Sequence, residues 1–207
     1  MGKEGLDVSG IADSVAEVKQ AYKDLEQDGD IEKFEKTYTE ASRKIAKENA
    51  ARNLDNWDTV MDSWDGSDEA DKKVEEAAVT YGESVGQAIE NDEEWLKEAE
   101  SIFLSQDYET VDEAKKAWAQ AVSDVVTGGK RSVPQDAIDT IYTYAPTSVL
   151  NKVRRLQLFE PNGAMDVKYG GNEEILDFAK DWIGDNDIKA SYASEIDFTQ
   201  DEEAVNR

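Results

Sequence analysis

The fold is decided by residues 8–45, which read VSGIADSVAEVKQAYKDLEQDGDIEKFEKTYTEASRKI. In the first half of this stretch, apolar residues recur at spacings of three and four: Val8, Ile11, Val15, Val18, Tyr22 and Leu25. The second half repeats the spacing with Ile31, Phe34, Tyr38, Ala41 and Ile45. Such spacing places the apolar side chains on one face of an α-helix, and Asp28-Gly29-Asp30 interrupts the chain between the two runs. The stretch therefore predicts an antiparallel helical hairpin with a short turn.

Helical spacing continues along most of the chain. After Ile45 the apolar residues change phase across 54–64, and further helical faces follow at 69–90, 95–103, 111–125, 138–142, 147–158 and 173–183. Gly82 and Gly86 are four residues apart and predict a groove where a neighbouring helix packs closely. Residues 164–169 fit a short strand, and the weak alternation over 188–198 fits an extended arm. The predicted fold class is mainly α: a multi-helix bundle that opens with the long antiparallel hairpin and closes with a small mixed C-terminal tail.

Composition changes along the chain suggest three regions. Residues 1–127 form an acidic helical bundle, and residues 128–160 a helical segment of contrasting, basic character that belongs to the same domain. Residues 161–207 form a small C-terminal region with one helix and the extended arm. The turn at Pro161-Asn162-Gly163 marks the last boundary.

Charge and composition limit the classes of protein to which this chain can belong. The 207 residues include 48 acidic and 23 basic side chains, a net charge of −25, and the sequence pI is about 4.2. Five Trp, eight Tyr and five Phe set the chain apart from acidic disordered proteins, which are poor in aromatic residues. The absence of cysteine and histidine excludes disulfides, thiolate metal sites and any catalytic triad that needs an imidazole.

The acid excess resembles that of halophile-type acidic proteins, from haloarchaea or halophilic viruses. At about 1 M salt the Debye length falls to about 3 Å, so like charges repel little while carboxylates keep the surface hydrated. One feature departs from this pattern, because such proteins favour Arg and here Lys outnumbers Arg by 17 to 6. The resemblance is compositional and points to no specific family.

Residues 127–159 contrast with this acidic background. This stretch contains five basic and two acidic residues, so its local net charge is +3. We predict that the basic residues belong to an interface: Lys130, Arg131, Lys152, Arg154 and Arg155. Three interpretations stay open. The basic residues pair with acidic helices of the same chain, or they form a socket for the acidic surface of another subunit. In the third, they contact nucleic acid held inside an assembly, since a protein of −25 is otherwise repelled by phosphate.

Two stretches resemble ion-binding or phosphate-binding motifs, but both motifs are incomplete. Counted from Asp62, the acidic series from Asp55 to Asp71 has Ser67 in place of the Gly at position 6 of a calcium-binding loop and Lys73 in place of the Glu at position 12. The stretch from Gly128 to Ser132 lacks the first Gly of a phosphate-binding loop and has Arg where Ser or Thr follows the Lys. We therefore expect no enzyme activity, no metal site and no cofactor.

These exclusions lead to a function hypothesis. We expect a non-enzymatic structural or assembly protein that belongs to a homo- or hetero-oligomer, such as a head–tail connector, adaptor or minor virion protein of a halophilic tailed virus. The alternative is a cytoplasmic acidic adaptor, or a DNA-mimic regulator that binds a basic protein surface. The chain has no run of 18 apolar residues and its first ten residues have no apolar core of a secretory signal. The expected location is therefore the virion or the cytoplasm.

Overall fold

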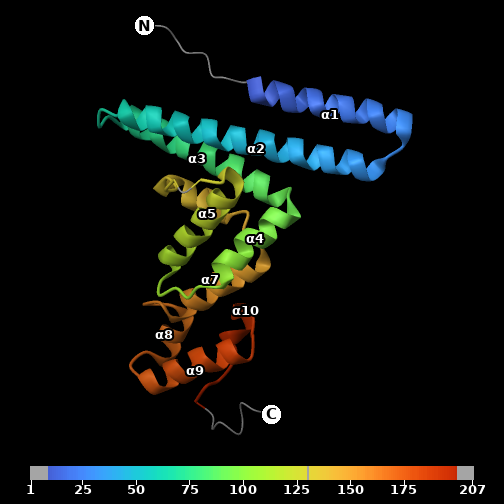
Figure 1. Cartoon of the computed structure of the whole chain (residues 1–207). Coiled ribbons are helices and arrows are strands. Elements are labelled where there is room, and N and C mark those ends of the chain that lie inside the picture. The colour runs from blue at the N-terminus through green and yellow to red at the C-terminus, as the bar shows by residue number, and fades with distance from the viewer. Residues whose placement is uncertain (1–8, 130, 200–207) are drawn as a thin grey trace. The chain divides into compact units, whose positions relative to one another are not determined.

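The computed structural model describes residues 9–129 and 131–199, and these residues fold as a mainly α structure, as predicted (Figure 1). No strand occurs within the described ranges. The helices are α1 (Ser9–Asp28), α2 (Ile31–Asp62), α3 (Asp68–Glu90), α4 (Glu93–Leu104), α5 (Val111–Thr127), the 3₁₀-helix η1 (Gln135–Ala137), α6 (Ile138–Tyr142), α7 (Thr147–Phe159), α8 (Ala164–Tyr169), α9 (Glu173–Asp185) and α10 (Ala190–Ala193).

The predicted hairpin is formed by α1 and α2 (Figure 1). Gly29 has a φ of +69°, which an L side chain rarely adopts, and this residue reverses the chain direction. Asp30 then caps α2, because its side chain accepts a hydrogen bond of 3.0 Å from the backbone N–H of Lys33. Val8, the first residue of the predicted apolar run, lies outside the described residues.

The two helices of the hairpin meet through smaller side chains than the spacing predicted. Ser14 and Ala21 of α1 are 0% and 8% exposed, and Ala41 of α2 is 1% exposed. The larger Val15 and Tyr22 are 39% and 54% exposed. A helix contact needs one stripe of side chains, and small residues on that stripe leave large neighbours at its edge.

The phase change after Ile45 does not end a helix, because α2 continues for 32 residues, about 48 Å at 1.5 Å per residue. No Gly or Pro lies within it. Figure 1 shows α1 beside the N-terminal part of α2 and α3 beside its C-terminal part. The phase of the apolar residues changes because α2 changes its packing partner.

The chain forms two compact units. Unit 1 consists of residues 1–99 and 119–144, and unit 2 of residues 100–118 and 145–207. Helices α4 and α5 each contribute residues to both units. These two units reflect how the residues pack, whereas the regions 1–127, 128–160 and 161–207 are divided by composition. The division into three regions therefore stays a prediction.

In unit 1, the two glycines of α3 allow the close approach that their spacing predicted. A methyl group on Gly82 would lie 2.9 Å from Cβ of Thr140, which is on α6. A methyl group on Gly86 would overlap the ring of Tyr144. Only glycine fits at these two positions without a shift of the neighbouring segment.

In unit 2, the prediction of a strand over 164–169 is wrong, since these residues form α8. Met165 and Tyr169, four residues apart, are buried on one side, and Val167 between them is 74% exposed. The alternation of apolar residues that suggested a strand would have buried all three side chains on one face. A helix buries Met165 and Tyr169 together in the core of unit 2 and leaves Val167 exposed, as observed.

The predicted extended arm over 188–198 is also corrected. The segment contains α10, and Phe198 at its end is 3% exposed. The Phe198 ring makes edge-on contacts with Tyr169, Phe178 and Trp182 at centroid distances of 6.3, 6.2 and 5.8 Å. The Tyr169 hydroxyl donates to the carbonyl of Ile196 and accepts from the N–H of Phe198. The segment is therefore packed into the core of unit 2.

Across the described ranges, no helix combines the length and the hydropathy that crossing a membrane requires.

Candidate functional site

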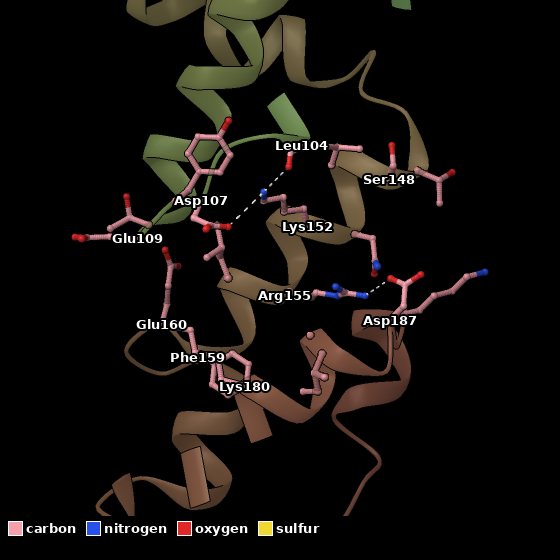
Figure 2. A pocket seen from close by; sticks show the side chains of 18 of the residues that line it. Leu104, Asp107, Glu109, Ser148, Lys152, Arg155, Phe159, Glu160, Lys180 and Asp187 are labelled. Atoms are coloured by element: carbon pink, nitrogen blue, oxygen red, sulfur yellow. Dashed lines mark hydrogen bonds and ion pairs between the residues drawn. The ribbon is translucent and has the colours of Figure 1, made fainter. Parts of the chain in front are cut away.

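A pocket in unit 2 has a volume of about 960 Å³ and contains two of the five predicted interface residues, Lys152 and Arg155 (Figure 2). Its lining comes from the α4–α5 loop, from α7 and from α9 with the residues that follow it. Several lining side chains are apolar: Leu104, Leu156, Phe159, Pro161 and Ile183. The charged ones are the acidic Asp107, Glu109, Glu160 and Asp187 and the basic Lys152, Arg155, Lys180 and Lys189.

Lys152 stabilises the end of α4. Its ammonium group donates to the carbonyl of Gln106 and, at 3.4 Å, to that of Leu104. It also lies 5.8 Å from the ring centroid of Phe103 and 5.2 Å from that of Tyr108. A cation near the C-terminus of a helix interacts favourably with the unpaired carbonyls there, and aromatic faces add a cation–π attraction. The side chain is thus held by its own unit.

Arg155 fixes the connection between α9 and α10. Its guanidinium donates to the carbonyl of Ile188 at 3.1 and 2.9 Å and to the carboxylate of Asp187 at 2.8 Å. One turn earlier on α7, the Asn151 side chain accepts from the N–H of Ala190 at 2.8 Å. The polar side of α7 therefore holds residues 187–190 in place (Figure 2).

The pocket combines balanced charge with a partly apolar lining. Glu160 accepts from the N–H of Val111 at the start of α5, so this carboxylate has a structural role. Burial raises the pKa of Tyr108, and the charges of Glu113 and Asp107 act in the same direction. The phenol therefore stays protonated near neutral pH and donates to the carbonyl of Phe103. Such a pocket can bind an amphipathic segment, and the hydroxyl of Ser148 in its lining donates to the carboxylate of Glu100.

The other three candidates lie elsewhere. Arg131 belongs to unit 1, where it pairs with Asp55 at 2.7 Å and with Asp58, both on α2. The hydrogen bond that Arg131 donates to Asp55 is the largest cause that raises the pKa of Arg131. Arg154 is exposed, and no hydrogen bond or ion pair is recorded for it among the described residues. Lys130 lies outside the described residues.

Arg131 pairs with acidic residues of α2, in line with the first of the three interpretations of the basic stretch, whereas Lys152 and Arg155 bind carbonyls and loop carboxylates of their own unit. An additional contact with a partner stays a prediction. Among the described residues, Arg154 is exposed and forms no hydrogen bond or ion pair. Its side chain is therefore the candidate for such a contact.

The hairpin presents a surface that the spacing did not reveal. Val15 and Tyr22 of α1 and Ile31 and Tyr38 of α2 are 39%, 54%, 62% and 48% exposed. Tyr22 and Tyr38 lie on one side of the hairpin, because both rings contact that of Phe34, at 4.7 and 6.0 Å. Val15 and Ile31 precede Tyr22 and Tyr38 by seven residues and therefore share their helix faces. We call these four exposed residues the hairpin stripe.

A groove of about 720 Å³ adjoins the hairpin stripe at Tyr38. It lies between α2 and the α3–α4 corner, and its lining includes Ile45, Ala46, Arg52 and Trp95. The lining is rich in amide and hydroxyl side chains: Thr39, Ser42, Asn49, Asn53, Ser84, Gln87 and Asn91. Asp92 is the only acidic residue in the lining. In a chain with 48 acidic residues this composition is unusual.

The single acid of the groove is already paired. Asp92 accepts from Arg43 at 2.5 and 2.8 Å and from the N–H of Trp95 at 3.1 Å. The Arg43 hydrogen bond is the largest cause that holds the pKa of Asp92 below its ordinary value. Arg43 also pairs with Glu94 at 2.6 Å and lies 5.4 Å from the Trp95 ring centroid.

A simple count would have found this region. Residues 33–54 contain six basic residues, Lys33, Lys36, Arg43, Lys44, Lys47 and Arg52, against the acidic Glu35, Glu40 and Glu48. The local balance is +3, equal to that of residues 127–159. The apolar spacing of this stretch indicates a helix but carries no information about its charge.

The acidic series that fails as a calcium loop has structural partners. Asp55 and Asp58 pair with Arg131, and Asp71 accepts from the indole N–H of Trp64 at 2.7 Å. Asp65 accepts from the N–H of Ser67 at 3.0 Å, and hydrogen bonds from this serine hold the pKa of Asp65 below its ordinary value. No group of three or more acidic side chains within the described ranges is arranged to hold a metal ion.

Comparison with known proteins gives no family model, no curated protein and no solved structure that matches this chain.

Proposed function

We propose that this chain is a non-enzymatic structural or assembly protein that works as a subunit of a larger complex. The observation that supports the proposal is the hairpin stripe, in which two aromatic and two aliphatic side chains are between 39% and 62% exposed on one side of a helical hairpin. Grouped apolar side chains on a surface are typical of a site where another protein binds.

The architecture of the hairpin explains why it needs a partner. Two helices can bury only the side chains between them, and a third helix or layer is needed to cover a wider apolar face. Along the C-terminal part of α2, helix α3 provides that layer. Val15, Tyr22, Ile31 and Tyr38 have no such cover among the described residues. A helical segment of a partner would supply it.

The chain's charge sets the conditions under which the partner binds. At low salt, subunits that each carry −25 repel one another, and at about 1 M salt this repulsion is screened within about 3 Å. We therefore propose an assembly that strengthens with salt. A head–tail connector, adaptor or minor virion protein of a halophilic tailed virus fits this behaviour, and this narrower assignment follows from composition alone.

The test is light scattering coupled to size-exclusion chromatography, at about 0.15 M and again at about 1 M salt. We expect a defined oligomer that is favoured at high salt, and a shift to monomer when Tyr22 and Tyr38 are both changed to Ser. The matched control is Lys36→Ser, an exposed residue on the opposite side of α2, which should assemble like the wild type.

A wild-type monomer at both salt concentrations would overturn self-assembly. Affinity capture with the wild-type and Tyr22→Ser/Tyr38→Ser chains would then ask whether the stripe binds a different protein. Equal capture of the same proteins by both chains would remove the hairpin stripe from the proposed function.

A further inference from the structure

The exposed face of α2 has a symmetric arrangement of side chains. Ile31, Tyr38, Ile45 and Arg52 follow one another at intervals of seven residues, which places them on the same face of the helix. Ile31 is 62% exposed and projects from the surface, whereas Ile45 is half-buried in the groove beside Ala46 and Trp95. Tyr38 lies halfway between them, about 10 Å from each along the helix axis at 1.5 Å per residue.

An exposed isoleucine and an apolar recess at equal distances from one tyrosine form a self-complementary surface. If a second α2 lies antiparallel across the first, with a twofold axis at Tyr38, then Ile31 of each copy lies opposite Ile45 of the other. Surfaces that pair with themselves in this way are the rule in twofold-symmetric dimers.

We propose that a second copy of this chain binds here. The two α2 helices lie antiparallel, Tyr38 lies at the twofold axis, and Ile31 of each copy enters the groove lined by Ile45, Ala46 and Trp95 of the other. The proposal rests on the proposed function, and it names both the partner and the register of the contact.

The charges of the hairpin favour this partner. Arg52 is half-buried at the far end of the groove, and its recorded contact among the described residues is one hydrogen bond of 3.0 Å to Asn49. In the antiparallel register, the turn between α1 and α2 of the second copy approaches Arg52. That turn carries Asp28 and Asp30, and the Lys33 ammonium lies 3.6 Å from the carboxylate of Asp28. Each copy thus supplies an acidic turn and a cation that has no carboxylate partner within the described part of the chain.

Cross-linking can test the register cleanly, because the chain contains no cysteine. Glu35 and Ser42 flank Tyr38 on the stripe side of α2, and neither belongs to the apolar contact. In the antiparallel register, residue 35 of one copy lies beside residues 41 and 42 of the other. A mixture of Glu35→Cys and Ser42→Cys chains, treated at high salt with a short bismaleimide, should give mainly the mixed cross-linked dimer.

Two outcomes would overturn the proposal. A parallel pairing would cross-link Glu35→Cys to itself as readily as to Ser42→Cys. An unspecific encounter would cross-link a control mixture of Lys36→Cys and Ser42→Cys equally well, since Lys36 is exposed on the other side of α2. If light scattering still shows a stripe-dependent oligomer while the mixed product is absent, this inference fails and the proposed function stands.

A charge exchange tests the second contact. Arg52→Glu places an acid opposite the acidic turn and should weaken association about tenfold, because the twofold symmetry removes two favourable charged contacts at once. Adding Asp28→Arg in the same chain restores opposite charges in both halves of the dimer and should recover most of that loss. If the double variant associates no better than Arg52→Glu alone, Arg52 does not face the turn of a second copy.

Discussion

Aromatic side chains meet different surroundings in the two units of this protein. In unit 2, Phe198 is 3% exposed and is enclosed by Tyr169 of α8 and by Phe178 and Trp182 of α9. In unit 1, Tyr22 of the hairpin is 54% exposed although its ring contacts Phe34. Helical spacing correctly placed the hairpin's side chains on helices. The number of surrounding elements decided whether a side chain is buried, and a two-helix hairpin has too few.

The largest effect should come from removing the enclosed ring. Phe198→Ala deletes a buried aromatic side chain and should lower the free energy of unfolding of unit 2 by about 3–5 kcal/mol. Hydrogen exchange of α8 and α9 would localise the loss. Tyr192→Ala is the control in the same segment, because Tyr192 is 60% exposed, and should stay within about 0.5 kcal/mol of wild type. A loss below about 1 kcal/mol for Phe198→Ala would show that the cluster contributes little.

The next effect concerns the tight packing of α3 in unit 1. Gly86→Ala forces the Tyr144 ring to move and should destabilise the protein by about 1–3 kcal/mol, the usual cost of overpacking. Gly184→Ala on α9 meets no atom within 4 Å and should stabilise by up to about 1 kcal/mol through its better helix propensity. Thermal unfolding of both variants checks the difference in sign, and equal effects would contradict it.

An intermediate effect concerns the groove beside the hairpin. The side chains of Asp92 and Arg43 are 14% and 29% exposed, and Asp92→Asn should cost about 1.5–3 kcal/mol at neutral pH because it removes a charge-assisted pair. Glu94→Gln should cost much less, since Glu94 is 83% exposed. Urea unfolding of each variant at pH 7 measures both costs.

The same pair predicts a pH dependence with a defined sign. The folded-state pKa of Asp92 is lowered, so its stabilisation is fully present above the unfolded value of about 4 and is lost as the pH falls through the folded value. The difference in unfolding free energy between wild type and Asp92→Asn should therefore shrink below about pH 4. A difference that stays constant down to about pH 2 would remove the ionised pair as its cause.

The smallest effect on stability belongs to the hairpin stripe. Ile31→Ser replaces a 62% exposed side chain and should change the free energy of unfolding of the monomer by no more than about 0.5 kcal/mol. The free energy of unfolding is measured at low salt, where monomers are favoured. A change this small would strengthen the contrast with the large loss expected for Phe198→Ala. A loss above about 1.5 kcal/mol would show that Ile31 supports the fold of its own chain.

Much of the fold could be predicted from particular residues. The turn at Asp28-Gly29-Asp30 reverses the chain, and the capping residue Thr110 accepts from the N–H of Glu113 at the start of α5. Glu113 in turn accepts from the N–H of Glu109. These features are local, since each depends on residues within about one helical turn, and short-range sequence information is sufficient for them.

The candidate site was less predictable. Sequence reasoning identified the basic contrast of residues 127–159, but Lys152 and Arg155 bind carbonyls and a carboxylate of their own unit. The hairpin stripe was hidden because a spacing of three and four fits two neighbouring faces of one helix. Ser14 and Val15 differ by one position, and only the packing of α2 against α1 shows that the serine is buried and the valine exposed.

The sequence by itself determined the fold class, the hairpin, the glycine pair that lets another segment approach α3 closely, and the strongly acidic composition. These properties follow from spacing, backbone conformation and composition, which are set residue by residue. Only the tertiary structure decided that α8 is a helix, that Phe198 is enclosed and that a nearly acid-free groove adjoins Tyr38. Burial and charge pairing depend on segments distant in the chain, because a side chain's surroundings are set by every element that packs around it.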